Sequence, residues 1–431
     1  MTLPAVSANA LGLLSRTGLL GLVPVPTVRR WVVNAGRQAQ AAALPMSNVP
    51  QQLLVDVSVI HQHDAGTGIQ RVVRSVLSHL QTLPLAKHTV HAVAAQANRP
   101  YYYTASSGSS EGRQVTMQNG DVFLGLDLAA HLLPRHITQL LHWKFAGARL
   151  HFVVYDVLPL THPTYFTPKR VQHFKRWAWL IAGLADSLLC ISRAVQSDLQ
   201  AWVQKNFGLS PDQLPTQVIP LGGDFADNSA RTAPSEVVQT ALNRLQGQSW
   251  ALMVGTLEPR KCHAQLLNAF ELLWQQGHAV CLVLVGRAGW HTQLLQQRIA
   301  QHPQLNSKLY WFNDASDSEL QLFYQHCTGV VAPSLAEGYG LPLREAMAQG
   351  KPLLARDILV FKEVAGEHAR YFFDDTPEAF SYTLQDWLAA PQSGFEATSP
   401  QPMHTWAEAT RNILLALGVA TVSPTNLSVS E

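Results

Sequence analysis

Two glutamates stand eight residues apart in the segment 331–352, VAPSLAEGYGLPLREAMAQGKP. The segment opens as an apolar run that predicts a buried strand, continues as a glycine-containing loop with Glu337, and then predicts a helix that carries Glu345. Pro342 suits the start of this helix and Gly350 its end. Because a helix N-terminus offers free backbone N–H groups, the loop suits an anion, and the carboxylates suit hydroxyls of a sugar or ribose. The alternative is an ordinary strand-to-helix turn with solvated glutamates.

A pair of cations follows another apolar strand segment, 250–254, in the sequence GTLEPRKCH. Gly255, Arg260 and Lys261 lie between this strand and a helix expected over 265–274. An Arg-Lys pair at the carboxyl end of a strand can clamp a diphosphate, and arginine adds bidentate geometry. A solvated charged turn is the alternative interpretation.

A third candidate is the loop that holds Gly66, Thr67 and Gly68. It follows a strand expected over 53–60, LLVDVSVI, and precedes a helix whose apolar residues recur every three or four positions. Strand, Gly-Thr-Gly and helix form an arrangement that can cradle a phosphate. The dinucleotide fingerprint is incomplete because Arg71 stands where its third glycine would fall, so the loop is weak evidence for NAD.

Two histidines and an aspartate precede these glycines and could act as metal ligands: His61, His63 and Asp64. The sequence offers no evident further ligands to complete a metal site, so a solvated or substrate-facing loop is the favoured interpretation. Asp156 ends the strand segment 150–158, LHFVVYDVL, where open α/β sheets place ligands. Its alternative role is that of a helix cap or turn former.

Composition bounds the class of protein. The 431 residues favour two or three domains, and a content of 47% hydrophobic and 14% charged residues indicates a globular chain. A net charge of +2 gives no reason to expect nucleic acid as a partner. The four cysteines are far apart, which predicts buried thiols in a reducing compartment, and no apolar run is long enough to span a bilayer.

Residues 1–50 form a basic N-terminal extension, because Asp56 is the first acid of the chain. The segment matches a signal peptide poorly. Two interpretations stay open: a basic amphipathic segment that rests on an anionic membrane, and a loosely packed extension.

Strands and helices alternate along the remaining chain, which predicts parallel, doubly wound α/β sheets. A polar, proline-containing linker at 226–238 separates two halves. We expect one Rossmann-like domain over 51–240 and another over 245–397. We further expect a terminal helix within 398–417 that packs back on the first domain, and a frayed tail over 418–431.

Several ordered motifs resemble a known family. VGTLEPRK, LVGRAGW, DSELQLFY and PSLAEGYGLPLREAMAQGKP look like the C-terminal half of glycosyltransferase family 4, whose GT-B fold has two Rossmann-like domains facing a cleft. Glu337 and Glu345 match its E-x7-E motif. DAGTGIQRVVRSVL and VVYDVLPLTHPTYF resemble a bacterial subgroup that builds O-antigen and exopolysaccharide chains and includes many mannosyl- and rhamnosyltransferases. The resemblance covers residues 53–417.

The resemblance implies roles for the candidate residues. Arg260 and Lys261 would hold the diphosphate of a nucleotide-sugar donor and stabilise the leaving group. Glu337 would bind hydroxyls of the donor sugar, and Glu345 its ribose. The resemblance implies further donor-binding residues, most of which would approach the donor with their backbone groups: Gly66, Thr67, Gly68, Gly255, Gly338, Tyr339, Gly340 and Leu341.

The chain departs from the family pattern at two positions. Asp156 stands where the family often has a His-Asp pair, but the histidine position holds Tyr155, which puts any role of that histidine in doubt. Cys262 stands where glycine is usual, so the turn there is expected to differ slightly. The sequence contains no Asp-x-Asp metal clamp, in agreement with the metal-independent habit of the family.

The resemblance implies a retaining, metal-independent glycosyltransferase with no further cofactor. On the subgroup resemblance alone, it would move mannose from GDP-mannose to a growing glycan or a lipid-linked saccharide, in the cytoplasm or at the cytoplasmic face of the inner membrane. Alternative functions are another GT-B enzyme, such as an epimerase or phosphorylase, and a catalytically silent partner subunit of a polysaccharide assembly complex. An NAD-dependent oxidoreductase is a more distant alternative.

Overall fold

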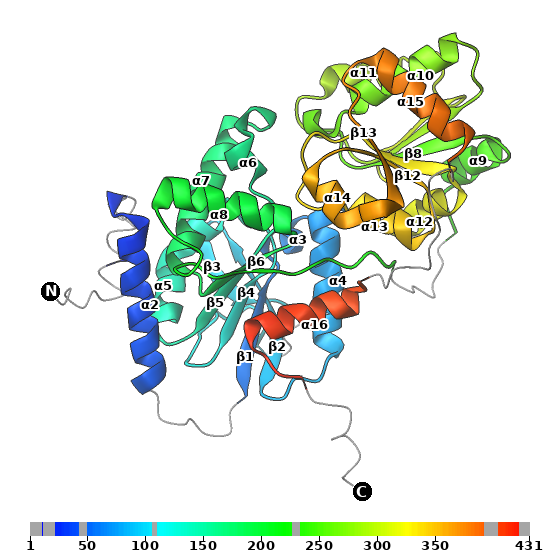
Figure 1. The fold of residues 1–431 in the computed structure, drawn as a ribbon. Helices are drawn as coiled ribbons and strands as arrows, with labels where there is room; N and C mark the ends of the chain where they lie inside the picture. Colours follow the sequence, from blue (N-terminus) through cyan, green and yellow to red (C-terminus); the bar gives the residue numbers. More distant parts are fainter. Residues whose placement is uncertain are drawn as a thin grey trace, which may run out of the picture. The chain divides into compact units, whose positions relative to one another are not determined.

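The computed structural model describes residue 11 and residues 22–42, 50–105, 110–225, 233–391 and 404–421 (Figure 1). Backbone contacts divide the chain into two units. Unit 1 comprises Met1–Leu221 together with Trp406–Glu431, and unit 2 comprises Gly222–Thr405. The C-terminal segment from Trp406 therefore rejoins unit 1 after the chain has formed unit 2.

Unit 1 is built on a seven-stranded sheet with the order β3-β2-β1-β4-β5-β6-β7. All neighbours pair in parallel except β2 and β3, which are antiparallel. The strands are β1 (Gln51–Asp56), β2 (His88–Gln96), β3 (Arg99–Tyr103), β4 (Val122–Gly125), β5 (Arg149–Val154), β6 (Ser187–Cys190) and β7 (Thr216–Val218). The helices are α2 (Val25–Ala42), α3 (Ser58–Gln62), α4 (Gly68–Thr82), α5 (Ile137–Phe145), α6 (Leu158–Thr161), α7 (Pro168–Leu184), α8 (Arg193–Phe207) and α16 (Trp406–Leu417).

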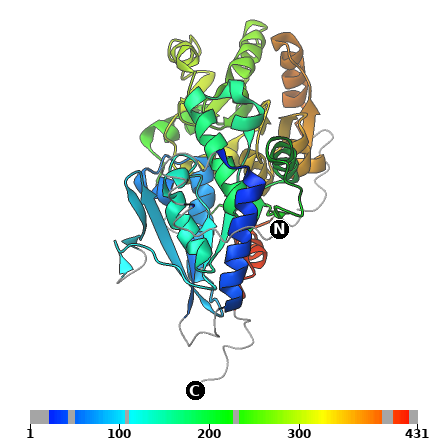
Figure 2. The same ribbon diagram turned by 90° about the vertical axis from the view of Figure 1, so that its left-hand side faces the viewer.

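The helix α2 corrects the alternative of a loosely packed extension for the described part of residues 1–50. Its apolar residues Val25, Val28 and Val32 are buried, and the helix packs on α5 and α7 (Figures 1 and 2). Arg29 is also buried, and its guanidinium donates hydrogen bonds to the carbonyl oxygens of Ala182 and Ala185. The apolar face of α2 is thus part of the core of unit 1, because neighbouring helices cover it.

The predicted strand over 53–60 is only partly correct. The strand β1 ends at Asp56, and the apolar residues that follow form the short helix α3. Two carboxylates explain the change, because Asp56 accepts a hydrogen bond from the Ser58 N–H and Asp127 accepts those of Val59 and Ile60. These side chains take the N–H groups that a continuing strand would have offered to a neighbour.

Unit 2 is built on a six-stranded, fully parallel sheet with the order β10-β9-β8-β11-β12-β13. Its strands are β8 (Trp250–Val254), β9 (Cys281–Val285), β10 (Leu309–Phe312), β11 (Gly329–Ala332), β12 (Leu353–Arg356) and β13 (Ala369–Phe372). Its helices are α9 (Glu236–Leu245), α10 (His263–Gln275), α11 (Gln293–Ala300), α12 (Asp317–His326), α13 (Leu341–Ala348), α14 (Leu359–Ala365) and α15 (Pro377–Ala389). Phe270, Leu284 and Trp387 lie in the core that the sheet forms with α10 and α15.

Two expected boundaries change. The expected first domain, 51–240, includes the first half of α9, but this helix packs on α12 of unit 2, and Ser235 just before it donates hydrogen bonds to Glu319. The start of the expected frayed tail is also ordered. Val419 is buried, and the Ala86 N–H donates a hydrogen bond to the Ala420 carbonyl, so the chain is held as far as Thr421.

Candidate functional site

The cation pair and Glu337 meet because β8 and β11 are neighbours in the sheet of unit 2. Both strands are parallel, so the loops that follow them leave the same edge of the sheet. A backbone hydrogen bond of 2.8 Å from the Leu335 N–H to the Arg260 carbonyl joins the two loops directly. Residues that are 77 positions apart in the sequence thereby become contacts.

Glu337 lies between the two cations. Its Oε2 accepts a hydrogen bond of 2.7 Å from Arg260 Nη1, and its Oε1 pairs with Lys261 Nζ. Arg260 Nη1 also donates to the carbonyl oxygen of Ala336 at 2.8 Å. On its other side, Arg260 Nε lies 3.0 Å from Glu258 Oε2, an ion pair whose atoms are not aligned for a hydrogen bond.

This cluster of Glu258, Arg260, Lys261 and Glu337 carries two positive and two negative charges, and each side chain is at most 13% exposed. Burial alone would raise the pKa of Glu337, but Arg260 and then Lys261 outweigh it and lower the pKa to about 2. Glu337 is therefore ionised at neutral pH and fixes both cations. Each carboxylate oxygen can accept a further hydrogen bond, so Glu337 can still bind a hydroxyl group.

Two glycines let the strands β8 and β9 end close together beside this cluster. Gly286 has a φ of +153°, and a Cβ there would lie 2.0 Å from the carbonyl oxygen of Gly255. Gly255 itself has a φ of +147°, and the Lys261 side chain runs past it at 3.5 Å from its ideal Cβ position. A side chain at Gly286 would push the two loops apart, and one at Gly255 would strain the backbone at its positive φ.

The helix α13 begins directly after the Glu337 loop. Gly340 caps it with a φ of +98°, and a Cβ there would meet the Phe361 ring at 2.8 Å. Glu345 is buried in the second turn, where its Oε2 accepts a hydrogen bond of 2.7 Å from the Tyr324 hydroxyl. The sequence analysis missed Tyr324, which is buried on α12 and carries no local signal of this contact.

Arg344, next to Glu345, was also missed. It is only 8% exposed, and its Nε and Nη2 atoms have no hydrogen-bond partner among the described residues. A buried guanidinium without a counter-charge lowers stability. Its presence on the first turns of α13 adds positive charge to the end of the sheet where Glu337 lies.

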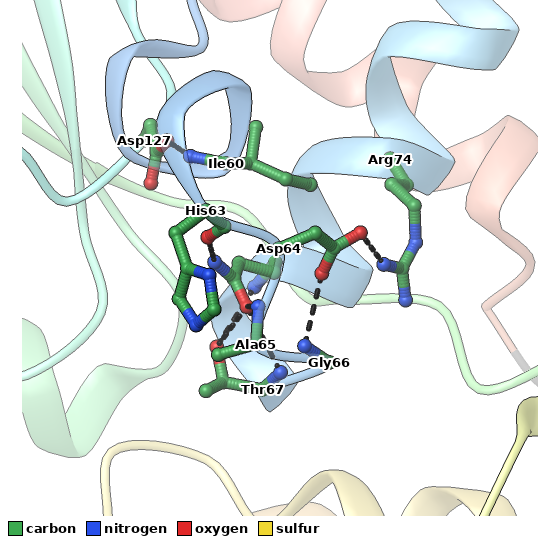
Figure 3. A network of polar contacts seen from close by, with 9 residues as sticks. Ile60, His63, Asp64, Ala65, Gly66, Thr67, Arg74 and Asp127 are labelled. Atoms are coloured by element: carbon green, nitrogen blue, oxygen red, sulfur yellow. Dashed lines mark hydrogen bonds and ion pairs between the residues drawn. The ribbon is translucent and has the colours of Figure 1, made fainter.

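The Gly-Thr-Gly loop lies in unit 1, at the start of α4 (Figure 3). Thr67 caps the helix and forms a capping box with Gln70. Gln70 accepts hydrogen bonds from the N–H groups of Ala65 and Thr67, and Asp64 accepts one from Gly66. The loop thus satisfies these three N–H groups internally, which leaves the N–H of Gly68 as the nearest helix N-terminal donor for an anion.

The alternative metal site at His61, His63 and Asp64 has competing contacts. Figure 3 shows the Asp64 carboxylate directed to Arg74 and to the Gly66 N–H. Across the ranges that the structure describes, no group of three or more His, Cys, Asp and Glu side chains could hold a metal ion.

Asp156 lies just past the end of β5, as the sequence predicts. Its Oδ1 accepts a hydrogen bond of 3.1 Å from the Leu158 N–H, so it closes the turn that leads into α6. Tyr155 is buried, and its hydroxyl donates to the Leu126 carbonyl at 2.7 Å. Tyr155 therefore supports the loop after β4 and does not point outward as a replacement for a catalytic histidine.

Two buried carboxylates escaped the sequence analysis, although each stands alone inside an apolar run. Asp56 ends β1 and Asp127 follows the neighbouring β4. Asp56 accepts hydrogen bonds from the hydroxyls of Ser58 and Tyr101, and burial and then Asp127 raise its pKa to about 7. The pair positions α3 and so fixes the start of the loop that carries the Gly-Thr-Gly sequence.

None of the helices in the described ranges is both long enough and apolar enough to cross a membrane.

Comparison with known proteins adds an independent observation. Residues 238–410 match the family "Glycosyl transferases group 1". A serotype-specific mannosyltransferase WbdA of Escherichia coli is 39% identical over 348 residues, which are 79% of this chain and 41% of the relative. The O-antigen chain mannosyltransferase B of Escherichia coli is 27% identical over 215 residues, 49% of this chain and 54% of the relative. The chain spans about two fifths of the length of the WbdA relatives.

Solved structures share the fold. Anabaena Alr3699/HepE, determined with UDP and glucose, has a TM-score of 0.59 at 16% identity over 85% of this chain and 99% of that one. WaaG, a glycosyltransferase involved in lipopolysaccharide biosynthesis, has a TM-score of 0.54 at 17% identity over 84% and 94% of the two chains. The predicted GT-B fold class, with two Rossmann-like units, is confirmed. The match to the group 1 glycosyl transferases covers residues 238–410, nearly all of which lie in unit 2.

Proposed function

We propose that this protein is a retaining, metal-independent glycosyltransferase that moves mannose from GDP-mannose to a growing polysaccharide or lipid-linked glycan. The cluster of Glu258, Arg260, Lys261 and Glu337 is the observation that carries this proposal. It places two fixed cations and an ionised carboxylate at the carboxyl edge of a parallel sheet, where ligands of such sheets bind.

The cluster suits the chemistry of a departing diphosphate. As the bond from the sugar to the donor breaks, negative charge grows on the leaving phosphate oxygen. Arg260 and Lys261 are already held by Glu337, so they stabilise this charge without having to reorganise. Glu337 retains acceptor capacity for a sugar hydroxyl, which would orient the donor against the acceptor.

The rest of the donor would extend along the N-terminus of α13. Backbone groups of Gly338, Tyr339, Gly340 and Leu341 would approach the donor, and Glu345, oriented by Tyr324, would bind the ribose. Arg344 supplies a buried positive charge that a donor phosphate would neutralise. For unit 1 taken by itself, the family resemblance adds to the proposal a phosphate-binding role for Gly66, Thr67 and Gly68 at the N-terminus of α4, and a role in sugar transfer for Asp156.

The relatives support the choice of sugar and acceptor. WbdA and O-antigen chain mannosyltransferase B are named as mannosyltransferases, and the second name includes the O-antigen chain. Mannose and a glycan acceptor are therefore the first choices to test here. We include in the proposal contact with the inner membrane from its cytoplasmic face, because a lipid-linked acceptor would lie there. The sequence holds no Asp-x-Asp clamp, which supports transfer without a metal cofactor.

The test begins with donor binding. Thermal unfolding is followed with GDP, UDP, dTDP and ADP, each in the presence of EDTA, for the natural protein and for Lys261→Met. GDP alone should raise the Tm of the natural protein, and the shift should vanish in the variant. A glycan acceptor is then incubated with GDP-mannose, and the anomeric configuration of the product is read by NMR.

Each outcome bears on the proposal. Stabilisation by UDP or another nucleotide in place of GDP would contradict GDP-mannose as the donor and point to a sugar carried by that nucleotide. Dependence on a divalent metal would contradict the metal-independent mechanism, and an inverted product would contradict retention. Absence of any nucleotide shift would overturn donor binding and favour a catalytically silent subunit.

A further inference from the structure

One stretch of unit 1 is nearly free of carboxylates. Between Asp127 and Asp186, Asp156 is the only acidic residue, whereas the same stretch holds seven lysines and arginines. Lys144 pairs with Asp186, and Arg149 donates to the Leu417 carbonyl, so these two are committed inside the fold. The remaining cations are concentrated near the start of α7 and in the 3-10 helix η3 (Leu133–His136).

The fold brings these cations together. The helices η3 and α7 pack on each other, and the rings of His131 and His173 lie with their centroids 6.2 Å apart. Burial lowers the pKa of both imidazoles, and so do the positive charges of Arg135 and Lys169 close to them. Arg176 acts in the same way on His173. We call His131, Arg135, Lys169, His173 and Arg176 the basic patch.

The cations of the basic patch lack internal counter-charges. Arg135, Lys169 and Arg176 are exposed, and within the described ranges none of them forms an ion pair or a side-chain hydrogen bond. Other surface arginines of the chain are paired, such as Arg298 with Glu271 and Arg370 with Asp386. Holding three like charges together on one surface costs free energy, so the arrangement suits an anionic partner.

A cavity adjoins the basic patch. It has a volume of about 940 Å³, and Arg135, whose charge acts on both histidines, lines it. Its wall combines apolar residues such as Met117 and Ile137 with polar ones such as Gln139. A ligand with a phosphate and an uncharged, partly apolar body would match this combination, with its phosphate on the cations and its body in the cavity.

We propose that the basic patch docks this protein on an anionic phospholipid bilayer, with headgroup phosphates bound by Arg135, Lys169 and Arg176. The inference deepens the membrane contact of the proposed function and rests on it. It places that contact on η3 and α7 and not on α2, whose apolar face is already covered by α5 and α7.

The experiment measures binding of the full chain to vesicles by co-sedimentation. One set of vesicles contains phosphatidylcholine only, and the other contains about one third phosphatidylglycerol. The natural protein is compared with Lys169→Gln/Arg176→Gln and with the control Lys87→Gln/Lys205→Gln, which removes two exposed cations of unit 1 outside the patch. Each cation at an anionic surface contributes about a fivefold change in partitioning, so the patch variant should bind on the order of 25-fold more weakly.

The proposal requires binding to anionic vesicles only, a loss in the patch variant and little change in the control. An equal loss in the control, or no binding by the natural protein, would overturn it. Two competitors separate other anions from a bilayer. If free glycerol phosphate or a short DNA duplex bound as tightly and with the same dependence on Lys169 and Arg176, the partner would not be a membrane. GDP-induced stabilisation is measured in the natural protein and in the same variants. Its absence from the natural protein would contradict the proposed function and leave the lipid surface standing.

Discussion

Glu337 is an ionised carboxylate whose two oxygens hold two buried cations. The substitution Glu337→Gln removes that charge, so Arg260 and Lys261 stay buried with too little compensation. We expect the free energy of unfolding to fall by about 3 kcal/mol at pH 7, measured by urea denaturation. The double variant Glu337→Gln/Lys261→Gln restores the charge balance and should recover part of this loss, while sugar transfer stays abolished in both.

The pH dependence of the same group gives an independent check. The folded pKa of Glu337 is lowered to about 2 from an ordinary 4.5, so its contribution is complete above pH 4.5 and is lost as the pH falls towards 2. Glu337→Gln should lack this acid-dependent loss. Glu271→Gln serves as the control, because its pair with Arg298 is partly exposed and should contribute no more than about 1 kcal/mol. Equal effects at Glu337 and Glu271 would argue against a buried, coupled cluster.

Cys262 adopts a backbone conformation that suits glycine. Its φ is 60° and its ψ is 32°, in the left-handed region, directly between Lys261 and α10. Cys262→Gly should leave the Tm unchanged or raise it, because glycine reaches this region without strain. Cys262→Val should lower stability by about 2 kcal/mol, because a β-branched side chain tolerates this region poorly. If valine were accepted as well as glycine, the turn would not be left-handed in solution.

At the scale of single elements, Asp56 and Asp127 join β1 and β4 to α3. The folded pKa of Asp56 is raised to about 7 from 3.8, so its stabilising contribution is complete at low pH and is lost as the pH rises through 7. Asp56→Asn stays neutral and should gain stability relative to the natural protein by about 2–3 kcal/mol between pH 5 and pH 8. Denaturation at both pH values measures the difference in the free energy of unfolding between Asp56→Asn and the natural protein. Because both proteins carry the same histidines, the titration of the histidines cancels in this difference. A difference that does not change with pH would mean that Asp56 titrates normally.

The elements also show why some of the structure could be predicted. The strand β11 and the helix α13 carry their own signals, an apolar run, a capping glycine and a proline, so the sequence predicts both and the loop between them. The helix α3 depends on Asp127, which accepts its N–H groups from 67 and 68 residues away, so no local pattern could reveal it. The cluster around Glu337 lies between these cases. Its residues carry the family resemblance, but their pairing depends on the adjacency of β8 and β11.

At the scale of the whole molecule, unit 1 is completed only by the end of the chain. The helix α16 packs on α4, and its residues Ile413, Leu414 and Leu417 are buried. The expected return of the terminal helix follows from its amphipathic pattern, whereas the ordered turn up to Thr421 depends on Leu85 and Ala86 of a distant loop. Unit 2, by contrast, is formed by a continuous segment. The two units therefore differ in their dependence on α16.

Scanning calorimetry can separate the two units by this difference. Ile413→Ala opens a cavity between α16 and unit 1 and should cost about 2–4 kcal/mol, which lowers the Tm of unit 1 by about 5–10 °C. Leu415→Ala is the control on the same helix, because Leu415 is 75% exposed, and it should change little. GDP should raise the Tm of unit 2, which holds Arg260, Lys261 and Glu337, and this shift should persist in Ile413→Ala. If Ile413→Ala and GDP moved a single common transition, the units would unfold as one, and the nucleotide site would depend on α16 as much as the sheet of unit 1 does.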